Sequence, residues 1–118
     1  MANTVFEQVV LSGSTDGKPI LVAATSSPGT TIHTAQASAT LVDQVFLYAF
    51  CFHSTAVTLR IEFGGTTSTE TFVVTVQPNQ PLQLVVSGLI LRNSLVVKAW
   101  ASVTNVTTLS GWAYRATA

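Results

Sequence analysis

A few residues in this 118-residue chain have the chemistry that catalysis or metal binding requires. Cys51 with His33 or His53 could form a nucleophile and its base, and the two histidines with Asp43 could ligate zinc. Cys51, however, lies inside an apolar run that disfavours the thiolate, and the histidines lack the close paired spacing of dedicated zinc sites. We therefore interpret Cys51 as a small core hydrophobe, His33 as a residue that hydrogen-bonds near a turn, and His53 as the end of a hydrophobic strand.

The carboxylates do not suggest an active site either. Glu62 and Glu70 flank the glycine pair at 64–65, and nothing in their spacing brings them together in a cleft. Five acidic and five basic residues are a thin supply for catalysis. We expect no catalytic residue, no metal, no cofactor and no enzyme activity.

The composition indicates a subunit of a larger assembly. Hydrophobic residues make up 47% of the chain and charged residues only 8%, against roughly 25% charged in an average domain. A monomer with so few charged residues would expose apolar patches of the kind that mark interaction sites. The formal net charge is zero, so neither nucleic acid nor an anionic membrane is an expected partner. The longest apolar run has eight residues, far fewer than the roughly 20 of a membrane-spanning helix.

The elements that would position these residues are strands. Val57, Leu59, Ile61 and Phe63 alternate with polar residues, which predicts a half-buried strand with one dry and one wet face. Similar alternation between turn signals predicts strands at about 5–11, 19–25, 30–35, 44–53, 56–63, 69–77, 82–87, 95–103 and 106–115. Eight or nine short strands in one domain, residues 1–118, favour an all-β fold: an antiparallel β-sandwich resembling a jelly roll. Residues 1–8 could form an N-terminal arm, and they show no signal peptide.

One segment breaks the alternation, because residues 45–52 are apolar on both faces. Such a strand is buried on both sides, either within the sandwich or against a neighbouring subunit. Trp100 falls on the wetter face of its own strand, where an aromatic side chain suits an interface. Our candidates for an interface with another protein subunit are Phe46, Tyr48, Phe50, Phe52, Trp100, Trp112 and Tyr114.

Several strand and turn motifs carry a resemblance to a known group of proteins. They are Pro28-Gly29-Thr30, Ile32-His33-Thr34-Ala35, Asp43-Gln44-Val45, Leu47-Tyr48-Ala49, Leu59-x-Ile61-Glu62-Phe63-Gly64-Gly65, Gly88-Leu89 and Gly111-Trp112. Over residues 13–115 the chain resembles small β-sandwich virion proteins of tailed bacteriophages, similar to capsid decoration, or cement, proteins. The family pattern has Trp in place of Phe63 and a polar residue in place of Cys51.

The resemblance implies a function as well as a fold. It implies a homotrimer, made in the host bacterial cytoplasm, that binds the major capsid protein on the outer surface of an icosahedral capsid and stabilises the shell. It implies no catalytic residue. Two alternatives stay open: a virion-displayed module that binds carbohydrate or a receptor, and a head–tail connector or tail component.

Overall fold

The computed structural model describes residues 4–118, and these form nine strands and one short 3-10 turn. The strands are β1 (Val5–Val9), β2 (Ile20–Leu21), β3 (Thr30–Thr34), β4 (Asp43–Cys51), β5 (Val57–Phe63), β6 (Thr71–Val76), β7 (Gln83–Leu91), β8 (Val96–Ala101) and β9 (Thr107–Thr117). The 3-10 turn is η1 (Ser68–Glu70). Each predicted strand thus has a counterpart, and the all-β prediction is confirmed.

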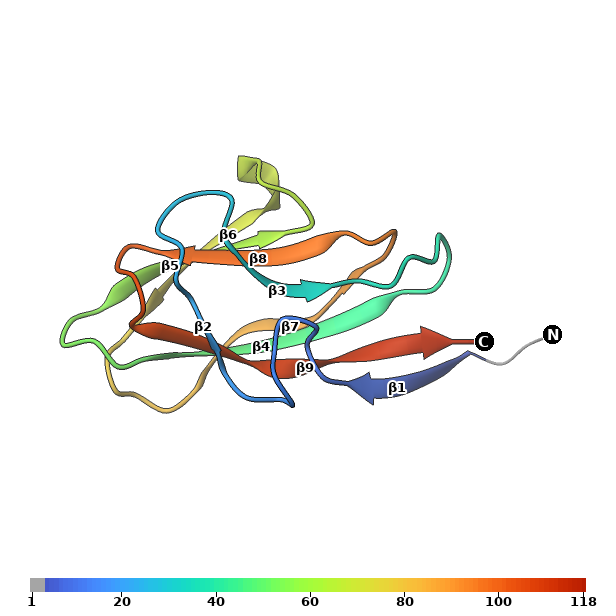
Figure 1. Cartoon of the computed structure of the whole chain (residues 1–118), viewed down its shortest axis with the longest axis horizontal. Coiled ribbons are helices and arrows are strands. Elements are labelled where there is room, and N and C mark those ends of the chain that lie inside the picture. Colours follow the sequence, from blue (N-terminus) through green and yellow to red (C-terminus); the bar gives the residue numbers. More distant parts are fainter. Residues whose placement is uncertain (1–3) are drawn as a thin grey trace.

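The strands form two antiparallel sheets that pack face to face (Figure 1). Sheet A has the order β1-β9-β4-β7, with β2 also paired to β9, and sheet B has the order β3-β8-β5-β6. The pairs β2·β9, β3·β8, β4·β7 and β5·β6 are nested, as in one long hairpin that has been rolled up. This nesting is the topology of a jelly roll, which confirms the single-domain antiparallel sandwich.

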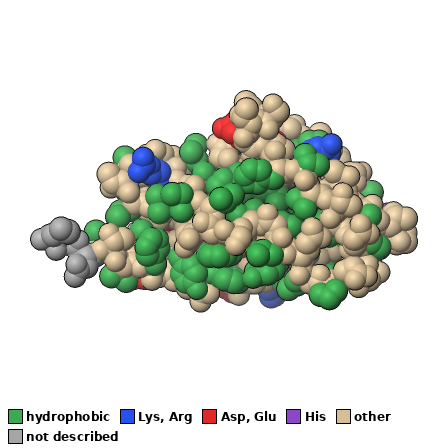
Figure 2. Space-filling view, turned by 180° about the vertical axis from the view of Figure 1, so that it is seen from behind, with side chains coloured by type: hydrophobic (Ala, Val, Ile, Leu, Met, Phe, Trp, Pro, Cys, Tyr) green, Lys and Arg blue, Asp and Glu red, His purple; other side chains and the backbone are tan. Residues whose placement is uncertain are grey.

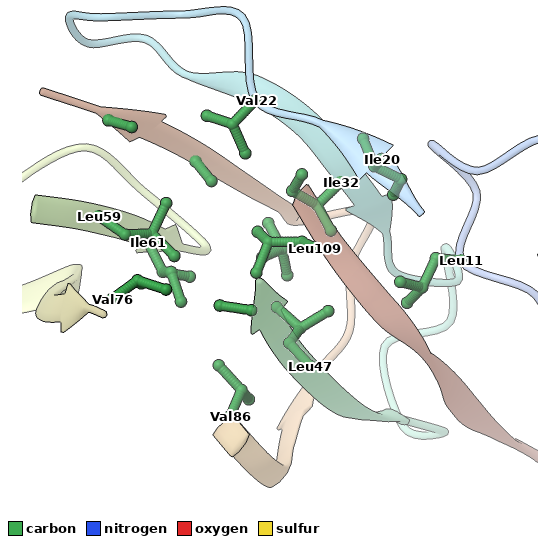
Figure 3. Close-up of a cluster of buried hydrophobic side chains, with 14 of the residues drawn as sticks. Leu11, Ile20, Val22, Ile32, Leu47, Leu59, Ile61, Val76, Val86 and Leu109 are labelled. Carbon is green, nitrogen blue, oxygen red and sulfur yellow. The ribbon is translucent and has the colours of Figure 1, made fainter. Parts of the chain in front are cut away.

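The core lies between the sheets and is built from the inward half of each alternating strand (Figure 3). On β4, Val45, Leu47, Ala49 and Cys51 are all buried. Opposite them in sheet B, the inward residues of β5 and β8 are fully buried, apart from Phe63 at the end of β5, which is partly buried. Cys51 is a free cysteine in this cluster, as expected for a core hydrophobe.

The predicted strand at 19–25 is much shorter in the structure. Only Ile20 and Leu21 pair regularly with β9, because the chain then leaves sheet A and crosses to sheet B. The Val22 N–H still donates to Thr107, but the Ala24 carbonyl already accepts from Ala101 at the end of β8. The predicted alternation of buried and exposed residues at 19–25 was correct. It does not reveal where the chain crosses from sheet A to sheet B.

The N-terminal region is a sheet edge from Val5 onward. Residues 5–9 pair antiparallel with β9, from Val5 opposite Thr117 to Val9 opposite Ala113. The predicted arm at 1–8 therefore overlaps β1 over residues 5–8, and its first three residues lie outside the described part of the chain.

Candidate functional site

The outer face of sheet A collects most of the aromatic side chains of the protein. Cross-strand pairing places Phe46 beside Trp112, Gln44 beside Tyr114, and Phe50 beside Thr108. We call the aromatic face the set Phe46, Tyr48 and Phe50 of β4 with Trp112 and Tyr114 of β9. Phe6 of β1 lies on the same side, because it is two residues before Gln8, which pairs with Tyr114. Six of the ten aromatic residues therefore point outward from this one sheet.

Four of these rings are in direct contact. The Phe46 and Trp112 rings stack with centroids 5.2 Å apart and an interplanar angle of 18°. Tyr114 meets Phe46 edge-on at 5.7 Å, and Tyr48 lies 5.9 Å from Trp112. Offset stacks and edge-to-face pairs are the favoured aromatic geometries, so these side chains hold one another in a fixed array.

Glycine is required at two positions beside this array. Gly111 approaches β4 so closely that a Cβ atom would lie 2.0 Å from the Phe46 carbonyl oxygen. Gly88, at a φ of 76°, sits at a break in the β4–β7 register, where a Cβ would lie 3.2 Å from the Phe46 ring. The Phe46 ring thus covers the backbone of β7 at a position that glycine keeps open.

No charged side chain interrupts the aromatic face among the strand positions described. The remaining outward positions of sheet A are apolar, amide or hydroxyl residues: Gln8, Leu21, Gln44, Leu84, Ser87, Ile90, Thr108, Ser110 and Ala116. The uncharged character extends through β6 and β7, since residues 71–91 contain no Asp, Glu, Lys, Arg or His. Figure 2 shows the side opposite to that of Figure 1, where hydrophobic side chains gather across the middle and the few charges lie near the margins.

The structure brings together five of the seven predicted interface residues. Phe46, Tyr48, Phe50, Trp112 and Tyr114 share the aromatic face, and the outward residues of β4 are half-buried. Burial of this strand on both sides was therefore wrong for the single chain, because only its inward half is buried.

The other two predicted residues lie apart from this face. Phe52 follows the end of β4 and is 49% exposed in the loop before β5, so the strand ends one residue too early to include it. Trp100 points outward from sheet B, where the Arg60 guanidinium lies 4.7 Å from its ring centroid. Trp100 is thus partly covered by its own chain.

Sheet B presents a different outer face. Its outward positions include Arg60, Glu62 and Lys98, which are three of the ten charged residues. Glu62 was expected on a wet face, but it is only 1% exposed. The loop before β3 folds over it, with the Ser27 hydroxyl donating at 2.5 Å and the Gly29 N–H donating at 2.8 Å to its carboxylate.

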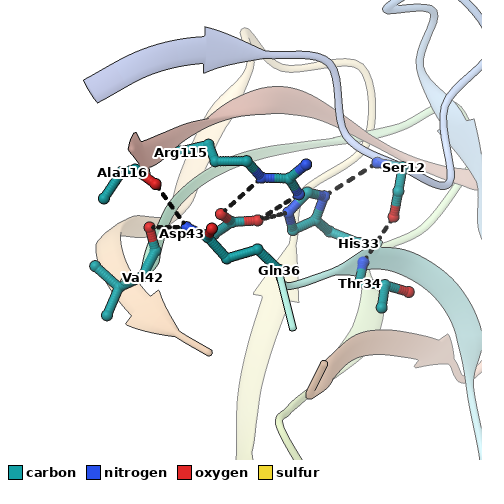
Figure 4. Close-up of polar contacts among 8 residues, drawn as sticks. All are labelled: Ser12, His33, Thr34, Gln36, Val42, Asp43, Arg115 and Ala116. Atoms are coloured by element: carbon teal, nitrogen blue, oxygen red, sulfur yellow. Dashed lines mark hydrogen bonds and ion pairs between the residues drawn. The ribbon is translucent and has the colours of Figure 1, made fainter. Parts of the chain in front are cut away.

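A buried polar cluster joins the two sheets (Figure 4). Asp43 of β4 accepts hydrogen bonds from Arg115 Nε at 3.0 Å and Nη2 at 2.8 Å, and its Oδ2 lies 2.8 Å from His33 Nε2. His33 and Asp43 are both fully buried. The Ser12 N–H donates to His33 Nδ1, so Nε2 carries the ring proton and donates to Asp43.

These contacts set the charge state of the cluster. Burial is the strongest influence on the pKa of the Asp43 carboxyl and would raise it, but the hydrogen bonds from Arg115 and His33 outweigh burial and hold that pKa below 3.8. The hydrogen bond to Asp43 in turn raises the pKa of Arg115. The cluster is therefore a carboxylate held between a guanidinium and a neutral imidazole.

His33 hydrogen-bonds near a turn, as predicted, because Ser12 lies in the turn that follows β1; from within β3 it also reaches Asp43 of β4, a contact that was not predicted. His33 and Asp43, two of the candidate zinc ligands, do meet, but the Arg115 guanidinium occupies the third side of the carboxylate. A cation placed there favours a structural ion pair over a metal site.

The other candidate chemistry does not assemble among residues 4–118. The Cys51 thiol is buried and its hydrogen-bond partner is the Thr55 carbonyl, 3.8 Å away. Two surface hollows of about 210 and 370 Å³ flank Leu95, and neither contains a histidine, a cysteine or a carboxylate pair. Within the described range, no group of three or more His, Cys, Asp or Glu residues could hold a metal ion. No helix in that range is long and apolar enough to cross a membrane.

Sequence reasoning missed three participants. Phe6 lies in the predicted strand at 5–11 and in the possible arm at 1–8, but it was not among the predicted interface residues, although its place two residues before Gln8 puts both on one face of a strand. The absence of charged residues between 71 and 91 is a second signal in the sequence for an uncharged surface. Arg115, by contrast, is 72 residues from Asp43 in the chain, and no local pattern connects the two.

Comparisons with protein-family models, with curated proteins and with solved structures find no match to this chain.

Proposed function

We propose that this protein is a structural virion subunit, a capsid decoration or cement protein that binds the outer surface of an icosahedral phage capsid as a homotrimer. The single observation that carries the proposal is the aromatic face, a broad outward surface of sheet A with no charged strand position in the described chain. Aromatic residues are enriched and charged residues depleted at the centres of protein interfaces. A surface of this kind fits a protein partner, which we take to be the major capsid protein.

The order within the aromatic face suits such a role. The stacked Phe46 and Trp112 rings and the adjoining Tyr48 and Tyr114 are already held in place in the free chain. Binding then costs little additional ordering of side chains, which favours affinity. Hot spots of protein interfaces are typically Trp and Tyr anchors of this sort.

Stabilisation of the shell follows from mass action. A protein that binds the assembled shell but not its separated subunits shifts the equilibrium toward assembly. A trimer that engages three equivalent sites gains further through effective concentration. The jelly roll itself is compatible with this setting, since it occurs in viral capsid domains, but the fold alone does not fix a function.

Co-sedimentation with capsids that lack the protein tests this proposal. The wild-type chain should pellet with the capsids and raise their thermal stability. Replacing Tyr48 and Trp112 together by alanine should weaken binding by about 100-fold, the equivalent of roughly 2.8 kcal/mol. Val73→Lys is the matched control, because Val73 is 63% exposed on β6, away from the aromatic face. A wild-type chain that stays in the supernatant contradicts the proposal.

The same face supplies one observation for a different function, a virion-displayed carbohydrate- or receptor-binding module. Aromatic rings beside amide and hydroxyl groups can stack on sugars, and the buried Trp112 Nε1 has no hydrogen-bond partner among the described residues. Titration of tryptophan fluorescence with a panel of bacterial surface polysaccharides separates the two functions. A saturable change that is lost on Trp112→Ala supports the carbohydrate-binding module, whereas a flat response removes it.

A further inference from the structure

The two free edges of sheet A are the most apolar parts of the exposed surface. Of the large hydrophobic residues described as exposed, eight of twelve lie at these edges. Four are at the β1 and β2 edge, namely Val5, Phe6, Val10 and Leu21, and four are at the β7 edge, namely Leu82, Leu84, Leu89 and Ile90. We call these sets the β1 edge and the β7 edge.

Both edges lack the usual protection against pairing. The β7 edge has neither a lysine nor any other charged residue, and the β1 edge has only Glu7. Exposed apolar edge strands without charges are surfaces on which another chain can add. The one protective device on β7 is its irregular register with β4, which breaks near Gly88 and again between Leu47 and Tyr48. These breaks limit any new backbone ladder to short stretches, so side chains would supply most of the contact.

The direction of the strands decides how two copies can meet. All neighbours along the four-strand path β1-β9-β4-β7 are antiparallel, so β1 and β7 run in opposite directions. If a second copy is placed beside the first in the same orientation, its β1 lies antiparallel to β7 of the first. Such a contact joins two different surfaces, and it closes into a ring when the rotation between copies permits.

We propose that copies of this chain associate head to tail, with the β7 edge of one copy against the β1 edge of the next. The inference rests on the proposed homo-oligomer and identifies the surfaces that form it. A symmetric β7-to-β7 contact would cover one apolar edge and leave Val5, Phe6, Val10 and Leu21 in water. A head-to-tail ring covers both edges of every copy and leaves the aromatic face for the capsid.

Two variants, each blocked at one edge, test the arrangement. Leu84→Lys with Ile90→Lys blocks the β7 edge, and Val5→Lys with Val10→Lys blocks the β1 edge. These four side chains are 47% to 57% exposed, so the fold should survive, which circular dichroism verifies. Val73→Lys is again the control, because Val73 is at least as exposed and lies on sheet B.

Native mass spectrometry distinguishes the head-to-tail arrangement from the symmetric β7-to-β7 contact. We expect the wild type and Val73→Lys to form the same closed oligomer, and each blocked variant alone to be a 12.4 kDa monomer. An equimolar mixture of the blocked variants should give a dimer of twice that mass, because one intact β7 edge then meets one intact β1 edge. A β1-blocked variant that dimerises alone, or a mixture that stays monomeric, overturns the proposal.

The capsid assay distinguishes this inference from the proposed function. A wild-type monomer that still pellets with capsids removes head-to-tail association and leaves capsid binding in place. If the wild type forms a closed oligomer and the blocked variants behave as expected, but the wild type does not pellet with capsids, capsid binding is ruled out and head-to-tail association stands.

Discussion

The two outer faces of the sandwich are built from strands with the same alternation, yet only the outer face of sheet B carries charged residues. The outer face of sheet B carries Arg60, Glu62 and Lys98, and the chain itself satisfies two of these groups, through the loop on Glu62 and the ring of Trp100 under Arg60. The aromatic face of sheet A has no charge to satisfy. Its rings contact one another but remain half-exposed.

This difference separates folding from association. Groups on sheet B have partners within the chain, so their loss should lower the free energy of unfolding. Groups on the aromatic face lack such partners on their outer side, so their loss should weaken binding to another molecule. Substitutions on one face, or in the cluster that joins the sheets, should therefore separate the free energy of unfolding from binding.

The largest effect on stability should come from the cluster beneath both faces. Asp43→Asn removes the charge that Arg115 and His33 share inside the sandwich, and breaking a buried pair typically costs about 3 kcal/mol. Urea unfolding at neutral pH measures this change. Asp16→Asn is the control, since Asp16 lies in an exposed turn. A loss for Asp43→Asn no larger than that of the control contradicts the structural role.

The same carboxylate predicts how stability depends on pH. Its pKa is lower in the folded chain than the ordinary 3.8, so its contribution is full above that value and is lost as the pH falls through the lower folded value. Urea midpoints measured from pH 6 to pH 2 should therefore fall more steeply for the wild type than for Asp43→Asn. Parallel curves for the two proteins would show that Asp43 is not the group responsible.

A substitution on the outer face of sheet B should lower the free energy of unfolding without weakening binding to the capsid. Glu62→Ala leaves the Ser27 hydroxyl and the Gly29 N–H without their buried acceptor, which should lower stability by about 2 kcal/mol. Capsid co-sedimentation at a temperature where the variant is folded should be unchanged. If Glu62→Ala abolished binding while Tyr48→Ala did not, the roles of the two faces would be reversed.

The smallest effect should come from Arg60. Its guanidinium lies over the Trp100 ring at a half-buried position, and a cation–π contact there contributes about 0.5 to 1 kcal/mol. Arg60→Ala should lower stability by that amount, and Arg60→Lys should recover part of it. Thermal unfolding of the three proteins checks the order, and an alanine variant as stable as the wild type would show that the contact contributes nothing.

The strands were predictable because their information is local. Alternation on β5 and β8 and the turn residues between strands gave nine elements, whereas the nested pairing joins strands as distant in the chain as β2 and β9. The structure also shows what alternation cannot reveal. Glu62 is at a position that the alternation predicts to be exposed. It is buried because the loop that contains Gly29, 33 residues earlier in the chain, folds over it.

The candidate site was predictable in part for the same reason. The aromatic residues of β4 stood out because both faces of that strand are apolar, but their contact with Trp112 depends on a cross-strand register that no local pattern fixes. The meeting of His33, Asp43 and Arg115 likewise depends on three strands from two sheets. Side chains joined only by topology escape prediction from a single sequence.

A cryo-electron microscopy map of capsids carrying the protein would show which sheet contacts the shell. Sheet A should face the shell, with Tyr48 and Trp112 buried against the major capsid protein and the outer face of sheet B in solvent. A map with sheet B against the shell and the aromatic face exposed to solvent would contradict this prediction.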